Sequence, residues 1–348
     1  MNSLQLRLFS IKCDCYFGTS ERIVMEGITE CRYGGPDDPL VREIMKKKGL
    51  SEVPLYRKDS PKSKKFDLNA CMARWMAYTP NRNGPINHER PEGSDPDRLT
   101  ELIKSKGLAV GGSDVGFAEL TPIMINVGFE FEQRYIISII VAEDYAKVLE
   151  GALAVEEEAF EVYVECARVS TELAEYIRSL GFTAIADHNG TGEIQAIPAL
   201  YASGMGELGK HGSLIHPEFG PSFRPGFVIT DVPVIVEKPN IFGVQKTCET
   251  CRLCEQNCPP GAIRASDDFV ITEGVKRWQV DIPTCYEASR FRDEYCHICV
   301  DVCPYQHKSN RNPDRIQTYK TVMKKRKQAG YRTPAWFIED EDKVLGNG

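Results

Sequence analysis

Cysteine spacing is the strongest constraint in this sequence, because eight of its thirteen cysteines fall between residues 248 and 303. The first run has the pattern Cys-x2-Cys-x2-Cys-x3-Cys-Pro and consists of Cys248, Cys251, Cys254 and Cys258. In bacterial ferredoxins three cysteines of such a run bind one [4Fe–4S] cluster, and the fourth binds a second cluster. A shorter run follows, formed by Cys296, Cys299 and Cys303. The two runs together predict two [4Fe–4S] clusters.

The exchange of ligands between the runs also predicts which cysteines share a cluster. The first cluster is expected to bind Cys248, Cys251, Cys254 and Cys303. The second is expected to bind Cys258, Cys296 and Cys299, and it lacks one ligand because Asp293 stands three residues before Cys296. Cys285 is the nearest spare cysteine, and we predict that it is the fourth ligand.

Two other roles for the cysteines fit less well. Zinc sites use two pairs of cysteines and rarely a run of three followed by a fourth before proline. Disulfide frameworks are typical of short secreted chains, whereas this chain has 348 residues. Its first residues show neither the long apolar core of a signal peptide nor a twin-arginine pair. The cysteines are therefore expected to bind iron–sulfur clusters in a reducing compartment, the cytoplasm.

Composition agrees with a soluble globular protein. The chain is 42% hydrophobic and 27% charged, which is ordinary for such proteins. No apolar run approaches the roughly 20 residues needed to cross a bilayer, so no membrane span is expected. A net charge of -7 argues against a general nucleic-acid-binding protein, although the stretch at 320–330 is basic and predicted to be helical.

The chain before the cysteines reads as a mixture of helices and strands. A helix is expected from Asp97 to about Gly107, with Asp97 as its cap and with Leu99, Leu102 and Ile103 on its apolar face. The other expected elements are a buried strand at 134–143, helical stretches from 144 to about 180 ended by Gly181, a strand at 182–186, a short helix at 197–203 and a strand with tight turns at 219–235.

A glycine-rich segment follows the short helix and matches G-x-G-x-x-G through Gly204, Gly206 and Gly209. A dinucleotide-binding site requires a strand before this motif and a helix after it. Here a helical segment precedes and a strand-like segment follows, so the dinucleotide interpretation is rejected. The glycines are instead expected to let a flat ligand approach the backbone closely.

Four short motifs, IRSLGF, GELGKHG, FGPSFR and ITDVP, lie between residues 174 and 233, ahead of the cysteine runs. Together with CETCRLCEQNCP and CHICVDVCPY they resemble the reductive dehalogenases and, more distantly, the epoxyqueuosine reductases. The resemblance covers about residues 97–306. It implies an α+β protein in which a nitroreductase-like corrinoid-binding domain precedes a ferredoxin-like domain with two [4Fe–4S] clusters.

The resemblance also implies a cofactor and a reaction. The cofactor is cobalamin or a related corrinoid in its base-off form, and the chain lacks the Asp-x-His-x-x-Gly motif of lower-axial histidine ligation. Electrons are expected from an external low-potential donor of the ferredoxin or flavodoxin type. They would pass through the clusters to cobalt, for reductive cleavage of the carbon–halogen bond of a small organohalide.

Matching residue by residue, the resemblance places the proton donor at Tyr163 and the assisting cation at Arg224. A phenol donates a proton poorly at neutral pH, and a nearby cation stabilises the phenolate that remains. A tyrosine buried in the core is the structural alternative. The expected contacts to the corrinoid are Asn189, Gly204, Gly206, Gly209, Lys210 and His211.

The sequence departs from the motifs of the reductive dehalogenases at a few positions, and these departures keep other functions open. This chain has Phe182 where the dehalogenases have tyrosine, and it has Asp187 and His188 in a loop where they are not usual. Either side chain is a further possible proton donor. One alternative is an enzyme of tRNA modification resembling epoxyqueuosine reductase, and another is a non-catalytic protein of electron transfer or corrinoid reactivation.

The predicted domain organisation has four parts. They are an N-terminal extension of uncertain role at 1–95, the corrinoid-binding catalytic domain at 96–238, the two-cluster domain at 239–310 and a C-terminal tail packed on the core at 311–348.

Overall fold

The structure, a computed structural model, describes most of the chain from residue 68 to residue 334. The described residues are 46–47, 49, 68–88, 95–126, 128–189, 191–265, 269–272, 275–281, 284–285, 288, 295–308 and 312–334. Most of the predicted N-terminal extension, Asp293 and residues 335–348 lie outside them.

A four-stranded antiparallel sheet forms the centre of the fold, with strand order β1-β2-β6-β3. Its strands are β1 (Asp114–Glu119), β2 (Tyr135–Ala142), β3 (Ala184–Asp187) and β6 (Phe223–Thr230). The prediction of a buried strand at 134–143 is confirmed, because five consecutive residues of β2 are buried. Isoleucine fills four of these five positions, and such a run is typical of a strand covered on both faces.

Helices cover one face of the sheet, and a short helix with loops covers the other. The first face packs against α4 (Pro96–Ala109) and α5 (Ala152–Ser179) around Phe117, Ile137 and Leu173. The second face packs against α6 (Ala196–Ala202) around Ile136, Leu200 and Ile229. Side chains alternate between the faces along each strand, which is why neighbouring residues such as Ile136 and Ile137 enter different cores.

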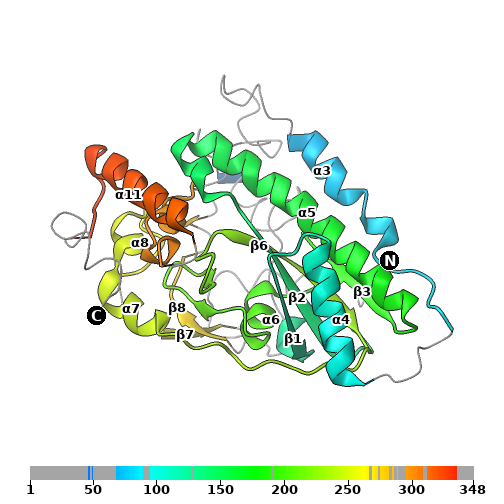
Figure 1. The fold of residues 1–348 in the computed structure, drawn as a ribbon. Coiled ribbons are helices and arrows are strands. Elements are labelled where there is room, and N and C mark those ends of the chain that lie inside the picture. Colours follow the sequence, from blue (N-terminus) through cyan, green and yellow to red (C-terminus); the bar gives the residue numbers. More distant parts are fainter. Residues whose placement is uncertain are drawn as a thin grey trace.

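Helix α5 is the longest element, with 28 residues, and it runs along the sheet (Figure 1). Helical spacing in the sequence predicts one inward face with Tyr163, Ala167, Ser170, Ala174 and Ile177. The last four are buried, whereas Tyr163 is partly exposed. Gly181, with a φ of 83°, follows the helix in the left-handed conformation that ends many helices. The preceding helical stretch is a 3-10 helix, η4 (Tyr145–Leu149).

Three details of the predicted elements differ from the structure. The cap of α4 is Asp95 rather than Asp97, because Pro96 supplies the first helical residue. Leu102 is 38% exposed, and the buried face consists of Leu99, Ile103 and Gly107, which follow one another at intervals of four residues. The strand expected at 182–186 lies at 184–187.

A further helix, α3 (Leu68–Met76), packs on the outside of α5. Trp75 stacks on Phe160 with ring centroids 5.5 Å apart, and Trp75 also meets the edge of Tyr163 at 5.7 Å. A 3-10 turn, η2 (Thr79–Asn81), follows α3. Tyr163 is therefore held in an aromatic cluster between two helices.

The cysteine-bearing segment lies at one end of the sheet (Figure 1). Its elements are α7 (Val244–Cys251), α8 (Leu253–Gln256), the hairpin of β7 (Phe269–Thr272) and β8 (Val275–Trp278), α10 (Ile298–Asp301) and η5 (Pro304–Gln306). Helix α11 (Pro313–Gln328) packs on this segment through Tyr319, Val322 and Met323. No helix within the described residues is long and apolar enough to cross a membrane.

Candidate active site

The thiols of Cys248, Cys251, Cys254 and Cys303, here called the first thiol group, lie close together. Three of them are buried and Cys251 is partly exposed. Burial raises the pKa of Cys303 well above its ordinary value, and the neighbouring charges of Cys254, Cys248 and Cys251 raise it further. Arg252 adopts a left-handed conformation, with a φ of 52°, between α7 and α8, and so turns the chain between two of these cysteines.

The second thiol group consists of Cys258, Cys285, Cys296 and Cys299. Burial raises the pKa of Cys285 to about 11, and the charges of Cys296 and Cys258 add to this effect. Burial also raises the pKa of Cys299, followed by the charges of Cys254, Cys285 and Cys296. Cys285 therefore lies beside Cys258, Cys296 and Cys299, the cysteines that the sequence assigns to the same cluster. Cys254 of the first group lies near Cys299 of the second, so the two groups adjoin.

The donor chemistry of the two groups fits iron–sulfur clusters. Thiolates are the usual ligands of [4Fe–4S] clusters, and metal binding displaces the protons that buried thiols otherwise retain. Within the described part of the chain, no three His, Cys, Asp or Glu side chains converge tightly enough to hold one metal ion. Each group of four neighbouring thiols supplies the four ligands that one [4Fe–4S] cluster requires.

A buried carboxylate ties the glycine-rich segment to the first cysteine helix. One oxygen of Glu207 accepts backbone hydrogen bonds from Phe242, Gly243 and Val244 at 2.5–3.1 Å, at the start of α7. An anion at this place satisfies free N–H groups and also interacts favourably with the helix dipole. Glu207 consequently fixes the helix that carries Cys248 and Cys251.

Replacing Glu207 by alanine is therefore expected to lower the free energy of unfolding by about 2–3 kcal/mol, because buried N–H groups lose their acceptor. The control is Glu119→Ala, which removes an ion pair with Arg134. The Glu119 side chain is 53% exposed. Such exposed pairs contribute up to about 1 kcal/mol. Anaerobic thermal unfolding measures both variants, and equal shifts of the midpoint would contradict the capping role.

Tyr163 and Arg224 come together from different elements. Tyr163 projects from α5, Arg224 lies near the start of β6, and the guanidinium carbon sits 5.1 Å from the centre of the tyrosine ring. This is a cation–π contact, so the ring that carries the tyrosine hydroxyl faces a fixed positive charge. The structure thus brings together the two residues that the family resemblance pairs.

The same arginine is anchored on two other sides. Its Nε lies 2.8 Å from Oε1 of Glu143, and its Nη2 donates to the hydroxyl of Tyr295 at 3.4 Å. Burial by itself would lower the pKa of Arg224, but the charges of Glu143, Tyr163 and Tyr295 together outweigh burial, and the pKa lies well above its ordinary value. Arg224 is therefore a permanent cation, held between the sheet and the segment that begins the second cysteine run.

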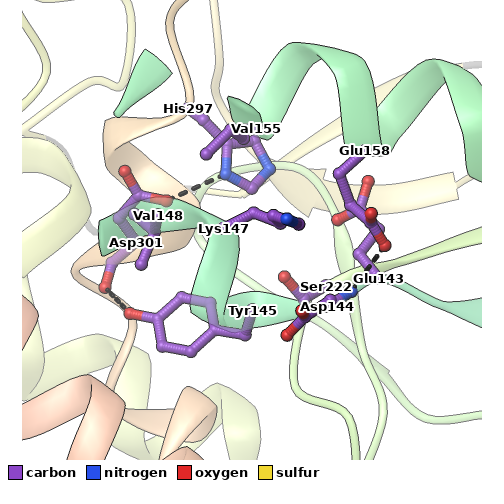
Figure 2. A pocket seen from close by; sticks show the side chains of 10 residues that line it. All are labelled: Glu143, Asp144, Tyr145, Lys147, Val148, Val155, Glu158, Ser222, His297 and Asp301. Atoms are coloured by element: carbon purple, nitrogen blue, oxygen red, sulfur yellow. Dashed lines mark hydrogen bonds and ion pairs between the residues drawn. The ribbon is translucent and has the colours of Figure 1, made fainter. Parts of the chain in front are cut away.

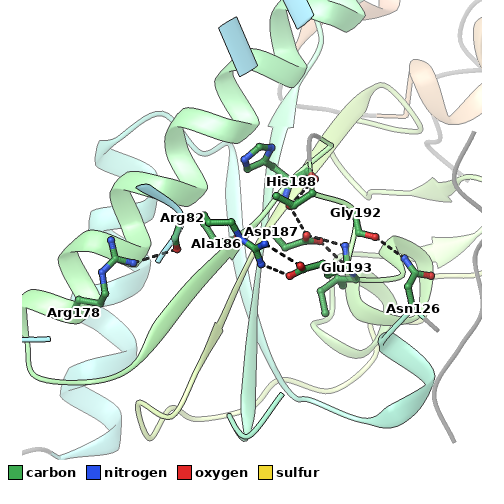
Figure 3. A network of polar contacts seen from close by, with 10 residues as sticks. Arg82, Asn126, Arg178, Ala186, Asp187, His188, Gly192 and Glu193 are labelled. Atoms are coloured by element: carbon green, nitrogen blue, oxygen red, sulfur yellow. Dashed lines mark hydrogen bonds and ion pairs between the residues drawn. The ribbon is translucent and has the colours of Figure 1, made fainter. Parts of the chain in front are cut away.

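Asp187 is the last residue of β3 rather than a loop residue, and it occupies a structural position (Figure 3). Its carboxylate accepts hydrogen bonds from the Thr191 hydroxyl at 2.5 Å and from the backbone N–H groups of Glu193 and Ile194 at 2.9 and 3.0 Å. Burial raises its pKa to about 6. Asp187 pairs with Phe227 in the sheet, three residues and roughly 10 Å along the strand from Arg224. Tyr163, rather than Asp187, stands beside the arginine.

The two residues after Asp187 differ in exposure. His188 is 2% exposed, and burial lowers its pKa to about 4, with the charge of Arg82 acting in the same direction. Arg82 itself forms an ion pair with Glu193 and donates to the carbonyl of Ala186 at 3.1 Å (Figure 3). Asn189 is exposed. The loop therefore presents Asn189 to its surroundings and keeps His188 neutral inside.

The glycines of the G-x-G-x-x-G match are crowded by other parts of the protein. A Cβ on Gly206 would lie 2.0 Å from the carbonyl oxygen of Ile215, and a Cβ on Gly204 would lie 2.9 Å from a carboxylate oxygen of Glu237. A Cβ on Gly209 would lie 2.8 Å from the His211 ring. The space beside these glycines is filled by the protein itself, and a flat ligand against their backbone stays a prediction. The helix α6 precedes the motif, β4 (Glu207–Leu208) lies within it and the strand β5 (Leu214–Ile215) follows it, as the rejection of a dinucleotide site requires.

Lys210 and His211, after these glycines, are both buried. Lys210 forms an ion pair with Glu255 at 3.0 Å and lies 4.8 Å above the centre of the Trp278 ring. The Nδ1 atom of His211 accepts a hydrogen bond from the Ser213 backbone at 3.2 Å. Burial lowers the pKa of His211 to about 4, so Nε2 carries the proton of a neutral ring.

The Nε2 atom of His211 is buried and has no hydrogen-bond partner among the described residues. A buried donor without an acceptor is costly, so its position calls for an explanation such as a bound group, an ion or a water. The protonated Nε2 therefore suits an acceptor, such as an amide or phosphate oxygen of a corrinoid side chain. Lys210, in contrast, is engaged by protein groups.

A small pocket opens between η4, the beginning of α5 and the segment after Cys296 (Figure 2). Glu143 and Glu158 lie on one side of the pocket, and His297 and Asp301 lie on another. The Nδ1 atom of His297 is 2.9 Å from Oδ1 of Asp301. The hydroxyl of Tyr145 donates to the Asp301 carbonyl at 2.9 Å. The carboxylate that anchors Arg224 thus borders a polar pocket at the junction with the cysteine-bearing segment.

Three of these residues escaped the sequence analysis. Glu143 follows a buried strand and carries no motif, and Tyr295 precedes Cys296 without belonging to the cysteine pattern. Glu207 lies within GELGKHG, where an acidic residue between glycines was a usable signal. Each acts through a contact that is distant in the sequence.

Comparison with known proteins places the cysteine runs in a recognised family. Residues 247–307 match the family described as 4Fe-4S dicluster domain. A tetrachloroethene reductive dehalogenase of Sulfurospirillum multivorans is 37% identical over 139 residues, 38% of this chain and 27% of that protein. One from Desulfitobacterium hafniense is 28% identical over 246 residues, 67% of this chain and 44% of that protein. The chain thus spans less than half the length of these relatives.

Two further comparisons bear on fold and on the alternative function. A solved reductive dehalogenase, described in connection with B12-dependent dehalogenation, superimposes with a TM-score of 0.64 at 24% identity, over 78% of this chain and 39% of that one. An epoxyqueuosine reductase of a Synechococcus species is 32% identical over 123 residues, 32% of this chain and 36% of that protein.

Proposed function

We propose that this chain, a relative of the reductive dehalogenases in sequence and in fold, is a corrinoid-dependent reductase that cleaves a carbon–halogen bond of a small organohalide. The observation that carries the proposal is the position of Arg224. It contacts Tyr163 on one side and, through Tyr295, the segment that carries Cys296 on the other. A candidate proton donor and a candidate electron path therefore meet at one residue.

The cofactor set follows from the donors described above. The first and second thiol groups would each hold one [4Fe–4S] cluster, with Cys285 as the eighth ligand. A base-off corrinoid would be held in a nitroreductase-like domain, with Asn189 and His211 among its contacts. We leave Gly204, Gly206, Gly209 and Lys210 out of the contact set, because protein atoms already occupy their neighbourhoods. When bound, the corrinoid supplies a reduced cobalt centre and the clusters supply single electrons.

The chain's own residues would supply the proton and its control. Tyr163 holds a proton on its hydroxyl, and Arg224 stabilises the phenolate that forms when this proton is given to the substrate carbon. Glu143 and Tyr295 hold Arg224 in place, so the cation does not turn toward solvent. The aromatic contacts of Tyr163 with Trp75 and Phe160 fix the ring from the other side.

The direct test is corrinoid retention by the reconstituted protein. Anaerobically refolded protein, loaded with iron and sulfide and mixed with cobalamin, is expected to retain about one corrinoid per chain in gel filtration, measured by visible absorbance. His211→Phe replaces the imidazole by another aromatic ring and removes Nε2, together with the Nδ1 acceptor of the Ser213 backbone. It should weaken retention about tenfold, the usual effect of one lost hydrogen bond. Wild-type protein that retains no cobalamin would exclude both the dehalogenase proposal and the epoxyqueuosine reductase alternative.

The alternative is supported by the 32% identity to an epoxyqueuosine reductase over 123 residues. Substrate turnover separates the two functions, since one enzyme releases halide and the other reduces a modified nucleoside in tRNA. Release of bromide from a brominated phenol by the loaded, reduced protein supports dehalogenation. Corrinoid retention with turnover of the tRNA nucleoside alone would overturn it.

A further inference from the structure

Helix α11 has one face turned toward the cysteines and one flank turned outward. Tyr319, Val322 and Met323 are buried, and they share a hydrophobic cluster with Leu253 and Cys251. The outward flank carries Lys320, Lys324 and Lys327, which follow one another at helical spacing. Lys324 and Lys327 are exposed, and Lys320 is partly exposed. Only one helix thickness therefore separates these lysines from Cys251.

Lys308 extends this flank from a second segment. It is exposed, and its Nζ lies 4.5 Å above the centre of the Tyr305 ring, just after the second cysteine run. Burial lowers the pKa of the neighbouring His307, and the charges of Lys308 and Lys320 act in the same direction. Both lysines thus lie around one buried imidazole. We call Lys308, Lys320, Lys324 and Lys327 the lysine patch.

Packed rings lie directly beneath the lysine patch. The ring of His307 packs on that of Tyr319 with centroids 4.5 Å apart, and Tyr319 adjoins Cys251 in the hydrophobic cluster. Cys251 is the partly exposed member of the first thiol group, whereas Cys248, Cys254 and Cys303 are buried. Of that group, the edge at Cys251 is therefore the part nearest to solvent.

The patch contrasts with the charge of the whole chain, which is -7. Charged groups on one protein raise the association rate with a partner of opposite charge and orient the encounter. We propose that the lysine patch docks the acidic face of a small electron-donor protein of the flavodoxin or ferredoxin class, and that electrons enter the first thiol group's cluster at Cys251. This inference rests on the proposed function, which requires such a donor.

The transfer at this surface is a single electron. The reduced cofactor of the donor loses one electron and the cluster gains it, and no bond or proton changes place. A nucleic acid is the rival ligand for a basic surface, but single-stranded nucleic acids bind through exposed aromatic rings that stack on bases. The rings beside the patch, Tyr305, His307 and Tyr319, are all buried. The surface therefore suits charge-guided protein docking better.

The test compares two reductants of the cluster-loaded protein by stopped-flow absorbance. One is a reduced acidic flavodoxin and the other is photoreduced deazaflavin, a small molecule that needs no docking surface. Lys308→Glu combined with Lys324→Glu should slow reduction by flavodoxin at least tenfold at low ionic strength. The difference should fade in about 0.5 M salt, because screening removes the steering. Reduction by deazaflavin should stay at the wild-type rate.

The matched control carries the same change of charge elsewhere. Arg98→Glu combined with Lys238→Glu alters exposed residues on α4 and after β6, and should leave both rates unchanged. An unaltered flavodoxin rate in the patch variant would overturn the docking site. A patch variant that keeps the flavodoxin rate but loses binding to a tRNA stem-loop would overturn it in favour of nucleic acid. Wild-type protein that accepts no electrons from deazaflavin would instead refute the proposed function.

Discussion

Replacing Tyr163 by phenylalanine is expected to lower the rate of halide release by a factor of about 10²–10⁴, the usual contribution of a positioned acid. The variant removes one oxygen and keeps the ring. The ring contacts with Trp75, Phe160 and Arg224 are all made by its carbon atoms, so the packing between α3 and α5 should persist. Corrinoid and iron contents should therefore equal those of the wild type, while turnover with a reduced donor is lost.

The control for this experiment is Tyr176→Phe on the same helix. Tyr176 is partly buried, and its ring carries a contact with Lys106 at 5.6 Å. The same chemical change, remote from Arg224, should leave the rate unchanged. If Tyr163→Phe retains wild-type turnover, the acid lies elsewhere, and His188 and Asp187 become the candidates. Asp187→Asn then decides between them, since a rate that falls only in that variant identifies the carboxyl.

The sequence determined the cysteine chemistry better than the catalytic geometry, for a physical reason. Metal-ligand spacing is a local property of the chain, so the runs could be recognised without any knowledge of the fold. The pairing of Tyr163 with Arg224 came from family resemblance alone, because it joins α5 to β6 across 61 residues of chain. Helical spacing by itself favours a core role for Tyr163, and its aromatic contacts show that it also has one.

The contacts that hold the site were beyond reach of the sequence. Glu143 is an ordinary acidic residue after a strand until the antiparallel pairing of β2 and β6 brings Arg224 beside Val141. The glycines at 204 and 206 were correctly recognised as positions that demand glycine. What crowds them is the chain itself, and this depends on where β5 (Leu214–Ile215) and Glu237 pack. The sequence indicated that these two positions require glycine, but it did not indicate which atoms crowd them.

Replacing Cys285 by alanine is expected to halve the iron content of the reconstituted protein, from about eight to about four atoms per chain, because one cubane loses its fourth thiolate. Cys285 lies beside Cys296 and Cys258. Every other cysteine that the structure describes in this segment is already assigned as a cluster ligand. The electron path would then be broken at one cluster. Reduction of the remaining cluster by deazaflavin should persist, with the signal of a single [4Fe–4S] centre.

Cys71→Ala is the matched control, since it removes a buried thiol from the contact of α3 with α5 and leaves both thiol groups intact. Cys285→Ser separates folding from ligation, because a serine oxygen has nearly the size of the thiol but binds iron weakly. If the serine variant is folded and loses one cluster, ligation is the cause of the loss. Iron that stays at about eight atoms per chain in the alanine variant would exclude Cys285. The eighth ligand would then be sought at Asp293, where the spacing of the second run places it.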